Sequence, residues 1–104
     1  MMNIIDKICR MIEGREALDM LQEECAELIK AASKTIRVMN CDPTVDPRKV
    51  RENLIEELGD VQNMITIVMH KLLNPEEQWA VCSGESEKIQ RYYDRLKARE
   101  KHDA

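Results

Sequence analysis

Two pairs of acidic residues are the part of this 104-residue sequence best suited to chemistry. Residues three apart on a helix share a face, so Glu24 and Glu27 would form one converging pair of carboxylates and Glu57 and Asp60 a second. Two such helices facing each other would bring four carboxylates together. Hard oxygen donors of this kind suit Mg²⁺, Mn²⁺ or Ca²⁺ better than zinc or copper. We therefore predict a divalent metal site.

The apolar pattern around these acidic residues supports this prediction. At 3.6 residues per turn, the apolar residues of 50–72 form one stripe, and Glu57 falls within it. That stripe consists of Val50, Leu54, Leu58, Val61, Met64, Ile65, Val68 and Leu72. The preceding apolar line is Leu18, Leu21, Cys25, Leu28 and Ala32, with Glu24 on its flank. Carboxylates clustered on an apolar face are costly unless a cation neutralises them.

The two acidic motifs resemble a known signature. Glu23-Glu24-x-x-Glu27, followed later by Glu57-x-x-Asp60, is similar to the motif pair of the MazG-like all-α nucleoside triphosphate pyrophosphohydrolases, relatives of the dimeric dUTPases and dCTP pyrophosphatases. The resemblance, which spans residues 18–69, implies that Glu24, Glu27, Glu57 and Asp60 bind Mg²⁺. It also implies hydrolysis of a nucleoside triphosphate to the monophosphate and pyrophosphate by a metal-activated water, in a homodimer or homotetramer.

Further residues could serve such a site. Glu23 and Glu56 are each adjacent to a predicted ligand and are candidates for the general base, although both could equally be solvated surface charges. Lys34, Lys88 and Arg91 are candidate contacts for the phosphates. The last two lie among acidic residues, which is also the pattern of an ordinary solvated helix with ion pairs. The sequence does not identify the nucleobase or the sugar.

The overall composition predicts a small helical protein. Hydrophobic residues make up 43% of the chain and charged residues 35%, with no Phe and three Gly, which favours helices in a single domain over residues 1–104. A net charge of −4 and a pI near 5.2 argue against nucleic acid as a partner. The sequence has no Cys-x-x-Cys pair, signal peptide or apolar span, so we expect a cytoplasmic protein without membrane contact.

The same pattern sets the expected elements. Helices are predicted over residues 3–13, 15–38, 47–73 and 85–99, with a further short helix that begins at Asn74-Pro75. Gly14, the loop 40–46 and Ser83-Gly84 separate them, and residues 97–104 are expected to fray. The predicted fold is all-α, an antiparallel bundle of two long and two or three shorter helices. Its apolar stripes exceed what one hairpin can bury, so oligomerisation should complete it.

Two alternatives to an enzyme remain open. The chain could be a helical interaction module whose acidic pairs are surface charges or specificity devices at an oligomer interface, because the spacing 18, 21, 25, 28, 32 is heptad-like. It could also be a non-hydrolysing nucleotide or metal sensor on the same fold. Stability that ignores metal would favour the module, and nucleotide binding without turnover would favour the sensor.

Overall fold

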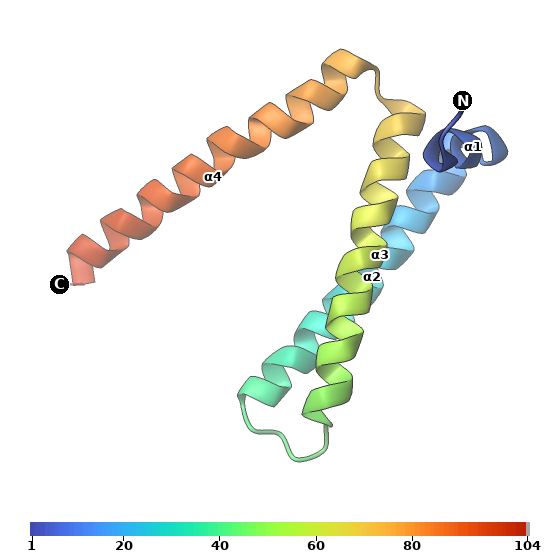
Figure 1. Cartoon of the computed structure of the whole chain (residues 1–104). Coiled ribbons are helices and arrows are strands. Elements are labelled where there is room, and N and C mark those ends of the chain that lie inside the picture. The colour runs from blue at the N-terminus through green and yellow to red at the C-terminus, as the bar shows by residue number, and fades with distance from the viewer. Residues whose placement is uncertain (104) are drawn as a thin grey trace. The chain divides into compact units, whose positions relative to one another are not determined.

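The computed structural model describes the backbone of residues 1–103 and their side chains, except those of residues 85, 86 and 103. This part of the chain is all-helical, as predicted, and contains no strand. Its helices are α1 (Ile4–Met11), α2 (Gly14–Met39), α3 (Pro47–Leu72) and α4 (Pro75–Asp103) (Figure 1). The chain divides into two compact units, residues 1–72 and residues 73–104, and each is described here by itself.

Capping residues set where the later helices begin. Before α3, the Asp46 carboxylate accepts a hydrogen bond from the backbone N–H of Arg48 at 3.0 Å, and Pro47 takes the first helical position. Before α4, Asn74 and Glu77 each accept a hydrogen bond from the other's backbone N–H, at 2.9 and 3.0 Å. Both starts match the sequence predictions.

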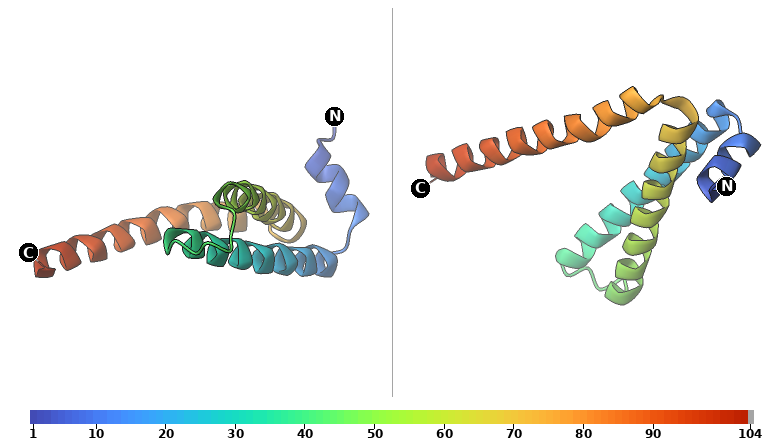
Figure 2. Two further views of the ribbon diagram at one scale, coloured as in Figure 1. Left: turned by 90° about the horizontal axis from the view of Figure 1, so that it is seen from below. Right: turned by 45° about the horizontal axis from the view of Figure 1, so that its top comes forward.

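Helices α2 and α3 form an antiparallel hairpin and lie side by side in every view (Figures 1 and 2). Their loop is held by Arg37, whose guanidinium donates to the Asp42 carboxylate and to the Thr44 hydroxyl, both at 2.9 Å. Hydrogen bonds from the Thr44 hydroxyl and backbone, and then from Arg37, lower the pKa of Asp42 to about 2. Cys41 takes a left-handed conformation with φ of 60°.

The core of the first unit lies where α1 packs against the hairpin. Ala17, Met64 and Ile67 are buried there. Half-buried apolar side chains surround them, namely Ile5, Ile8, Cys9, Ile12, Leu21 and Val68. Lys71 ties the end of α1 to α3, since its ammonium donates to the Cys9 carbonyl at 2.8 Å. One side of α1, with Ile5 and Ile8, therefore packs against the core, although Ile4 stays exposed.

On both helices, several residues that face the partner helix come one position before the residues expected in the apolar stripes. We define the α2–α3 seam as the inward-facing, buried or half-buried residues Ala17, Leu21, Glu24, Leu28 and Ala31 on α2 and Val50, Glu57, Asp60, Met64 and Ile67 on α3. Leu18, Leu58, Ile65 and Leu72 were expected in the stripes but are exposed by 41 to 50%. The small residues Ala17 and Ala31 are completely buried on the inward line of α2, whereas the larger Leu18 beside Ala17 is exposed.

The expected break at Ser83-Gly84 is wrong. Helix α4 continues through both residues and runs to Asp103, so residues 97–103, where fraying was expected, are helical in this structure, while residue 104 lies outside the described part. One internal glycine costs a helix only about 1 kcal/mol, too little to interrupt 29 residues. Whether the helices assemble into a larger bundle, and whether the whole chain is one domain, remain predictions.

Candidate metal centre

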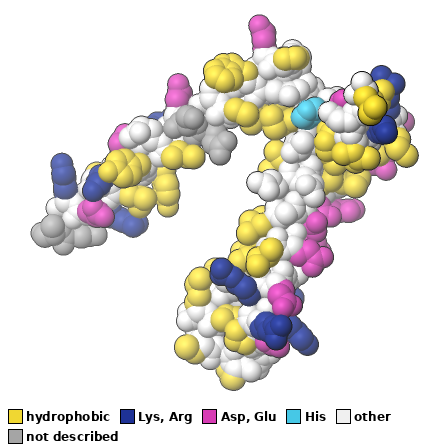
Figure 3. Space-filling model, viewed as in Figure 1, with side chains coloured by type: hydrophobic (Ala, Val, Ile, Leu, Met, Phe, Trp, Pro, Cys, Tyr) yellow, Lys and Arg dark blue, Asp and Glu magenta, His cyan; other side chains and the backbone are white. Residues whose placement is uncertain are grey.

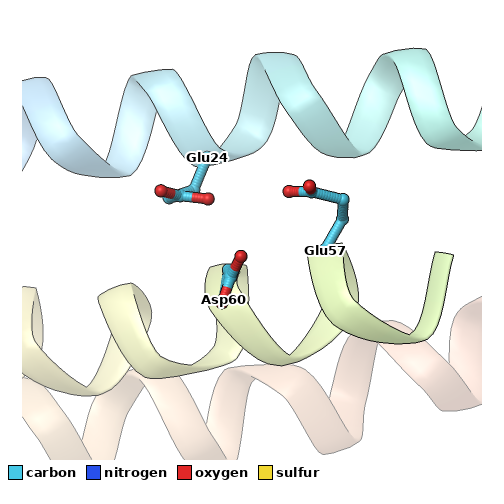
Figure 4. Close-up of side chains that lie close together, drawn as sticks. All are labelled: Glu24, Glu57 and Asp60. Atoms are coloured by element: carbon cyan, nitrogen blue, oxygen red, sulfur yellow. The ribbon is translucent and has the colours of Figure 1, made fainter. Parts of the chain in front are cut away.

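Three of the four predicted ligands come together in the α2–α3 seam. One carboxylate oxygen from each of Glu24, Glu57 and Asp60 lies within 4.8 Å of the other two. Glu24 extends from α2, and Glu57 and Asp60 extend toward it from α3 (Figure 4). All three side chains are half-buried. We call these residues the carboxylate cluster.

Helical spacing explains why these residues meet. Glu57 and Asp60 are three apart, so they project from the same side of α3 toward α2. Glu24 occupies the facing helix at a seam position between Leu21 and Leu28, two half-buried leucines. The apolar residues before and after each acidic position hold the helices together, and this packing fixes the carboxylates opposite each other.

The cluster is electrostatically unfavourable without a cation. The Oε2 atom of Glu57 is buried and has no hydrogen-bond partner. Burial raises the pKa of Glu57, and the negative charges of Asp60, Glu24, Glu27 and Glu56 raise this pKa further. A buried acceptor normally finds a donor, so an orphaned carboxylate oxygen facing two other carboxylates is where a cation would fit.

The fourth predicted ligand, Glu27, lies outside this cluster. Its side chain is 53% exposed and accepts from the Lys30 ammonium at 3.5 Å. It stays close enough for its charge to raise the pKa of Glu57. Its role as a ligand remains a prediction. The candidate general bases Glu23 and Glu56 are both exposed, and each is adjacent in sequence to a member of the cluster.

The predicted phosphate contacts fall in both units. Lys34 is exposed on α2, in the same unit as the carboxylate cluster. Lys88 and Arg91 line a shallow surface hollow on α4 together with Asp94 and Arg95. The structure brings Lys88 and Arg91 together with each other in the second unit and does not place them at the cluster, which belongs to the first unit.

The two long sides of the hairpin differ in chemistry. One long side of the hairpin carries charged residues that each come one position before a half-buried residue facing the partner helix, namely Glu23, Glu27, Lys34 and Glu56. One position corresponds to a rotation of about 100° round a helix, so all four lie on the same side of the two antiparallel helices. We call this the polar side. Figure 3 shows Asp and Glu side chains gathered along one side of the hairpin and hydrophobic side chains along another.

The opposite side of the hairpin is apolar and exposed, which the sequence interpretation missed. We call it the apolar face, and it consists of Leu18, Ile29 and Ile36 on α2 and Leu58, Ile65 and Leu72 on α3. Each follows an inward-facing position by one residue, which places all six on the same side of two antiparallel helices. Residues 55, 58, 59, 61, 62 and 65 line a shallow hollow on α3 in this region. The recurrence of Ile29 and Ile36 seven residues apart was a signal available in the sequence.

The chain matches no protein-family model, no curated protein and no solved structure. The resemblance to the MazG-like enzymes therefore rests on the two acidic motifs, and membership of that family stays a prediction. None of the helices in the described part of the chain is both long and apolar enough to cross a membrane.

The carboxylate cluster offers donors of a single chemical kind. Three carboxylates from two helices supply only hard oxygen donors, and the described residues bring no histidine or cysteine into the cluster. Such a donor set is typical of Mg²⁺ or Mn²⁺ centres that complete their coordination with water and phosphate oxygens.

Proposed function

We propose that the protein is a Mg²⁺-dependent nucleoside triphosphate pyrophosphohydrolase. The observation that carries the proposal is the carboxylate cluster, in which Glu24, Glu57 and Asp60 meet across two helices and Glu57 keeps a buried oxygen without a partner. Natural proteins tolerate such groups mainly where a cation binds. The reaction type comes from the resemblance of the motifs that contain these residues.

In this proposal the cluster holds Mg²⁺, or Mn²⁺ in its place, through three protein carboxylates. The ion, when bound, supplies positive charge to the triphosphate and lowers the pKa of a water. Glu23 and Glu56 then act as candidates to accept the proton from the attacking water, since both stand exposed beside the cluster. Glu27 is a candidate fourth ligand, because its side chain could turn from Lys30 toward the cluster.

The triphosphate would approach from the polar side of the hairpin. Lys34 lies on that side and would contact a phosphate, and Lys88 and Arg91 are candidates from α4. Products would be the nucleoside monophosphate and pyrophosphate. The base and sugar are not assigned, because no aromatic residue lies in the first unit to form a stacking surface for them.

We propose further that a second copy of the chain covers the apolar face, as a homodimer or a dimer of dimers. Six large aliphatic side chains exposed on one side of a two-helix unit are more than a small monomer usually leaves in water. Pairing of two hairpins through this face gives the antiparallel bundle expected from the sequence and leaves both polar sides open to substrate. Leu58→Lys should then lower the mass measured by light scattering, whereas Ile4→Lys, at an exposed site elsewhere, should not.

The decisive experiment measures pyrophosphate and monophosphate release from a panel of ribo- and deoxynucleoside triphosphates, with and without Mg²⁺. Glu57→Gln should lower kcat/KM by at least about 100-fold, since even residues that only support metal ligands cost 10- to 100-fold. Glu52→Gln is the matched control, because Glu52 is an exposed residue of the same helix that pairs with Arg48. No turnover of any nucleotide by the wild-type protein would reject the proposal.

The interaction module remains the second candidate, and the exposed apolar face is the observation that favours it. In that case the carboxylate cluster would serve only to restrict how the helices pair. Mg²⁺ would then leave the stability of the wild-type protein unchanged, and no nucleotide would be hydrolysed. A protein that binds metal and nucleotide without turnover would instead be the sensor.

A further inference from the structure

Helix α4 carries a second exposed apolar surface, separate from the hairpin. Its members are Trp79, Cys82, Ile89, Tyr93 and Leu96, which we call the α4 stripe. With residue 86 they follow the alternating spacing of three and four residues that characterises a coiled-coil seam. Trp79, Ile89 and Tyr93 are exposed by 71, 61 and 53%, and no described side chain of α4 is buried. Figure 3 shows hydrophobic side chains at intervals along this helix.

A helix with this composition needs a partner. Most helical stability in proteins comes from packing of an apolar face, and the described residues of the second unit, 73–102, offer the α4 stripe no such packing because they contain no other helix. The contacts of its aromatic residues are with cations of the same helix, since Arg95 lies 5.8 Å from the Tyr92 ring and Lys97 lies 5.8 Å from the Tyr93 ring. The Arg95 contact lies off the stripe, whereas the Lys97 contact is made by a member of the stripe, Tyr93, which remains 53% exposed.

The distribution of charge along α4 indicates which partner fits. Residues 75–87 contain four acidic residues and no Lys or Arg, whereas residues 88–102 contain six Lys or Arg and two acidic residues. One half of the helix is therefore negative and the other half positive. A second copy of the same helix in antiparallel orientation places each half against its opposite, while a parallel copy places like charges together.

We propose that α4 pairs with α4 of a second copy as an antiparallel two-stranded coiled coil. The register that centres the pair between residues 87 and 88 keeps the whole stripe in contact. In this register Trp79 lies opposite Leu96 of the second copy, and Cys82 lies opposite Tyr93. Glu76 then lies near Lys97 of the second copy, on the flank of the stripe. This pairing does not depend on the proposed enzyme activity.

Disulfide cross-linking of the full-length chain tests the register. We expect Tyr93→Cys to form an interchain disulfide with Cys82 under mild oxidation, because stripe residues that lie opposite each other in the coiled coil would meet the geometric limits of a disulfide. Within one helix the two positions are eleven residues apart and cannot be bridged. Asp94→Cys is the matched control, one residue off the stripe. Both variants carry Cys41→Ser to remove an exposed thiol, and mass spectrometry identifies the linked peptides.

The outcomes separate the alternatives. A dimer linked through positions 82 and 93 as the main product, with little from the control, supports the proposal. A Cys82–Cys82 link in the wild-type chain would show parallel pairing and overturn it. Equal yields from both variants, or no interchain link, would also overturn it and would be expected if the stripe packs on the hairpin of its own chain.

A charge swap gives an independent readout. Glu76→Lys should weaken dimerisation through α4, and adding Lys97→Glu to the same chain should restore it, because the two reversed charges again face each other in the antiparallel pair. The measurement is the yield of the 82–93 link in the Tyr93→Cys background. Failure of the second substitution to restore the yield would overturn the register, whatever the activity of the protein.

Discussion

The α2–α3 seam follows one helical spacing throughout, yet two neighbouring stretches of it contain opposite kinds of residue. Beyond them, toward the loop, the seam is apolar again at Leu28, Ala31 and Val50. Near α1 the seam is apolar, and Ala17, Met64 and Ile67 are buried. Farther along the hairpin, the same inward positions hold Glu24, Glu57 and Asp60. The first stretch removes apolar surface from water and has a helix packed over it, whereas the second places carboxylates against each other.

This difference indicates that the apolar stretch stabilises the fold, whereas the acidic stretch forms the candidate site. The apolar stretch fixes the distance and rotation of the two helices, so it supplies the free energy that holds three like charges together. The acidic stretch works against folding until a cation neutralises it. A site that costs stability and is held by its neighbours is typical of function. The following predictions test this division of roles.

The largest effect should come from the apolar stretch. Ile67→Ala removes a buried side chain and should lower the free energy of unfolding by about 2 to 4 kcal/mol. Ile4→Ala makes the same chemical change at a site that is 67% exposed, and should cost less than about 1 kcal/mol. Urea denaturation of both variants gives the comparison. Equal losses would mean that the α1–hairpin contact is not where the stability of this unit lies.

A bound metal ion should change the contribution of the acidic stretch to stability from unfavourable to favourable. Mg²⁺ or Mn²⁺ at 100 times its dissociation constant should raise the free energy of unfolding of the wild-type protein by about 2.7 kcal/mol. Glu57→Gln should abolish most of this gain, and Glu52→Gln should retain it. Thermal unfolding with the metal or with a chelator measures the effect. An equal gain in the Glu57→Gln protein would place the cation somewhere other than the carboxylate cluster.

Without metal, the effect of pH should follow the raised pKa of Glu57. The folded protein holds this proton more tightly than the unfolded chain, so the stabilising contribution is present at low pH. It is lost as the pH rises from the ordinary carboxyl range through the raised pKa. Glu57→Gln removes this loss, and the variant should therefore unfold at a higher temperature than the wild type near neutral pH.

That difference should shrink as the solution is acidified, because both proteins then carry a neutral group at residue 57. Thermal scans in chelator between about pH 4 and pH 8 cover the relevant range. Glu52→Gln again serves as the control, since its exposed partner Arg48 contributes little at any pH. A Glu57→Gln protein that is less stable than the wild type near neutral pH would contradict the conclusion that this carboxylate opposes folding.

The sequence was sufficient to predict α1, α2 and α3 and to place Glu57 and Asp60 on one face opposite Glu24, because helical spacing decides which residues share a face. It was not sufficient to identify the inward line. Two sets of residues, offset by one position, have the same spacing, and hydropathy favours the set that contains Leu18 and Leu58 over the set that contains Ala17 and Glu57. In the structure Ala17 is buried and Leu18 is exposed, and which of the two faces the partner helix depends on how both helices pack together.

Three other features of the structure depend on local contacts that the spacing of apolar residues in the sequence cannot predict. The turn of Glu27 toward Lys30 is a choice of rotamer on an exposed surface. The continuity of α4 through Gly84 reflects a balance between one unfavourable residue and many favourable neighbours. The network of Arg37, Asp42 and Thr44 is formed by a loop whose conformation sequence patterns leave open. In each case the local signal is weak and the surroundings decide.

The smallest expected effect distinguishes the two stretches through their glycines. At the apolar end, a methyl group on Gly14 would come within 2.6 Å of a terminal carbon of Leu72, an exposed side chain that can move aside. In the acidic stretch, a methyl group on Gly59 would meet no atom within 4 Å. Gly59→Ala should therefore raise the free energy of unfolding by up to about 1 kcal/mol through helix propensity, while Gly14→Ala should change it little.

The result for Gly59→Ala should depend on protein concentration if a second copy packs on the apolar face beside this residue. In dilute solution, where chains are separate, the variant should be more stable than the wild type. At concentrations that favour the oligomer, the added methyl group would occupy space that the second copy needs, and the gain should disappear. A gain that persists at every concentration would mean that the surface around Gly59 stays open to water, and the apolar face would then need a different occupant.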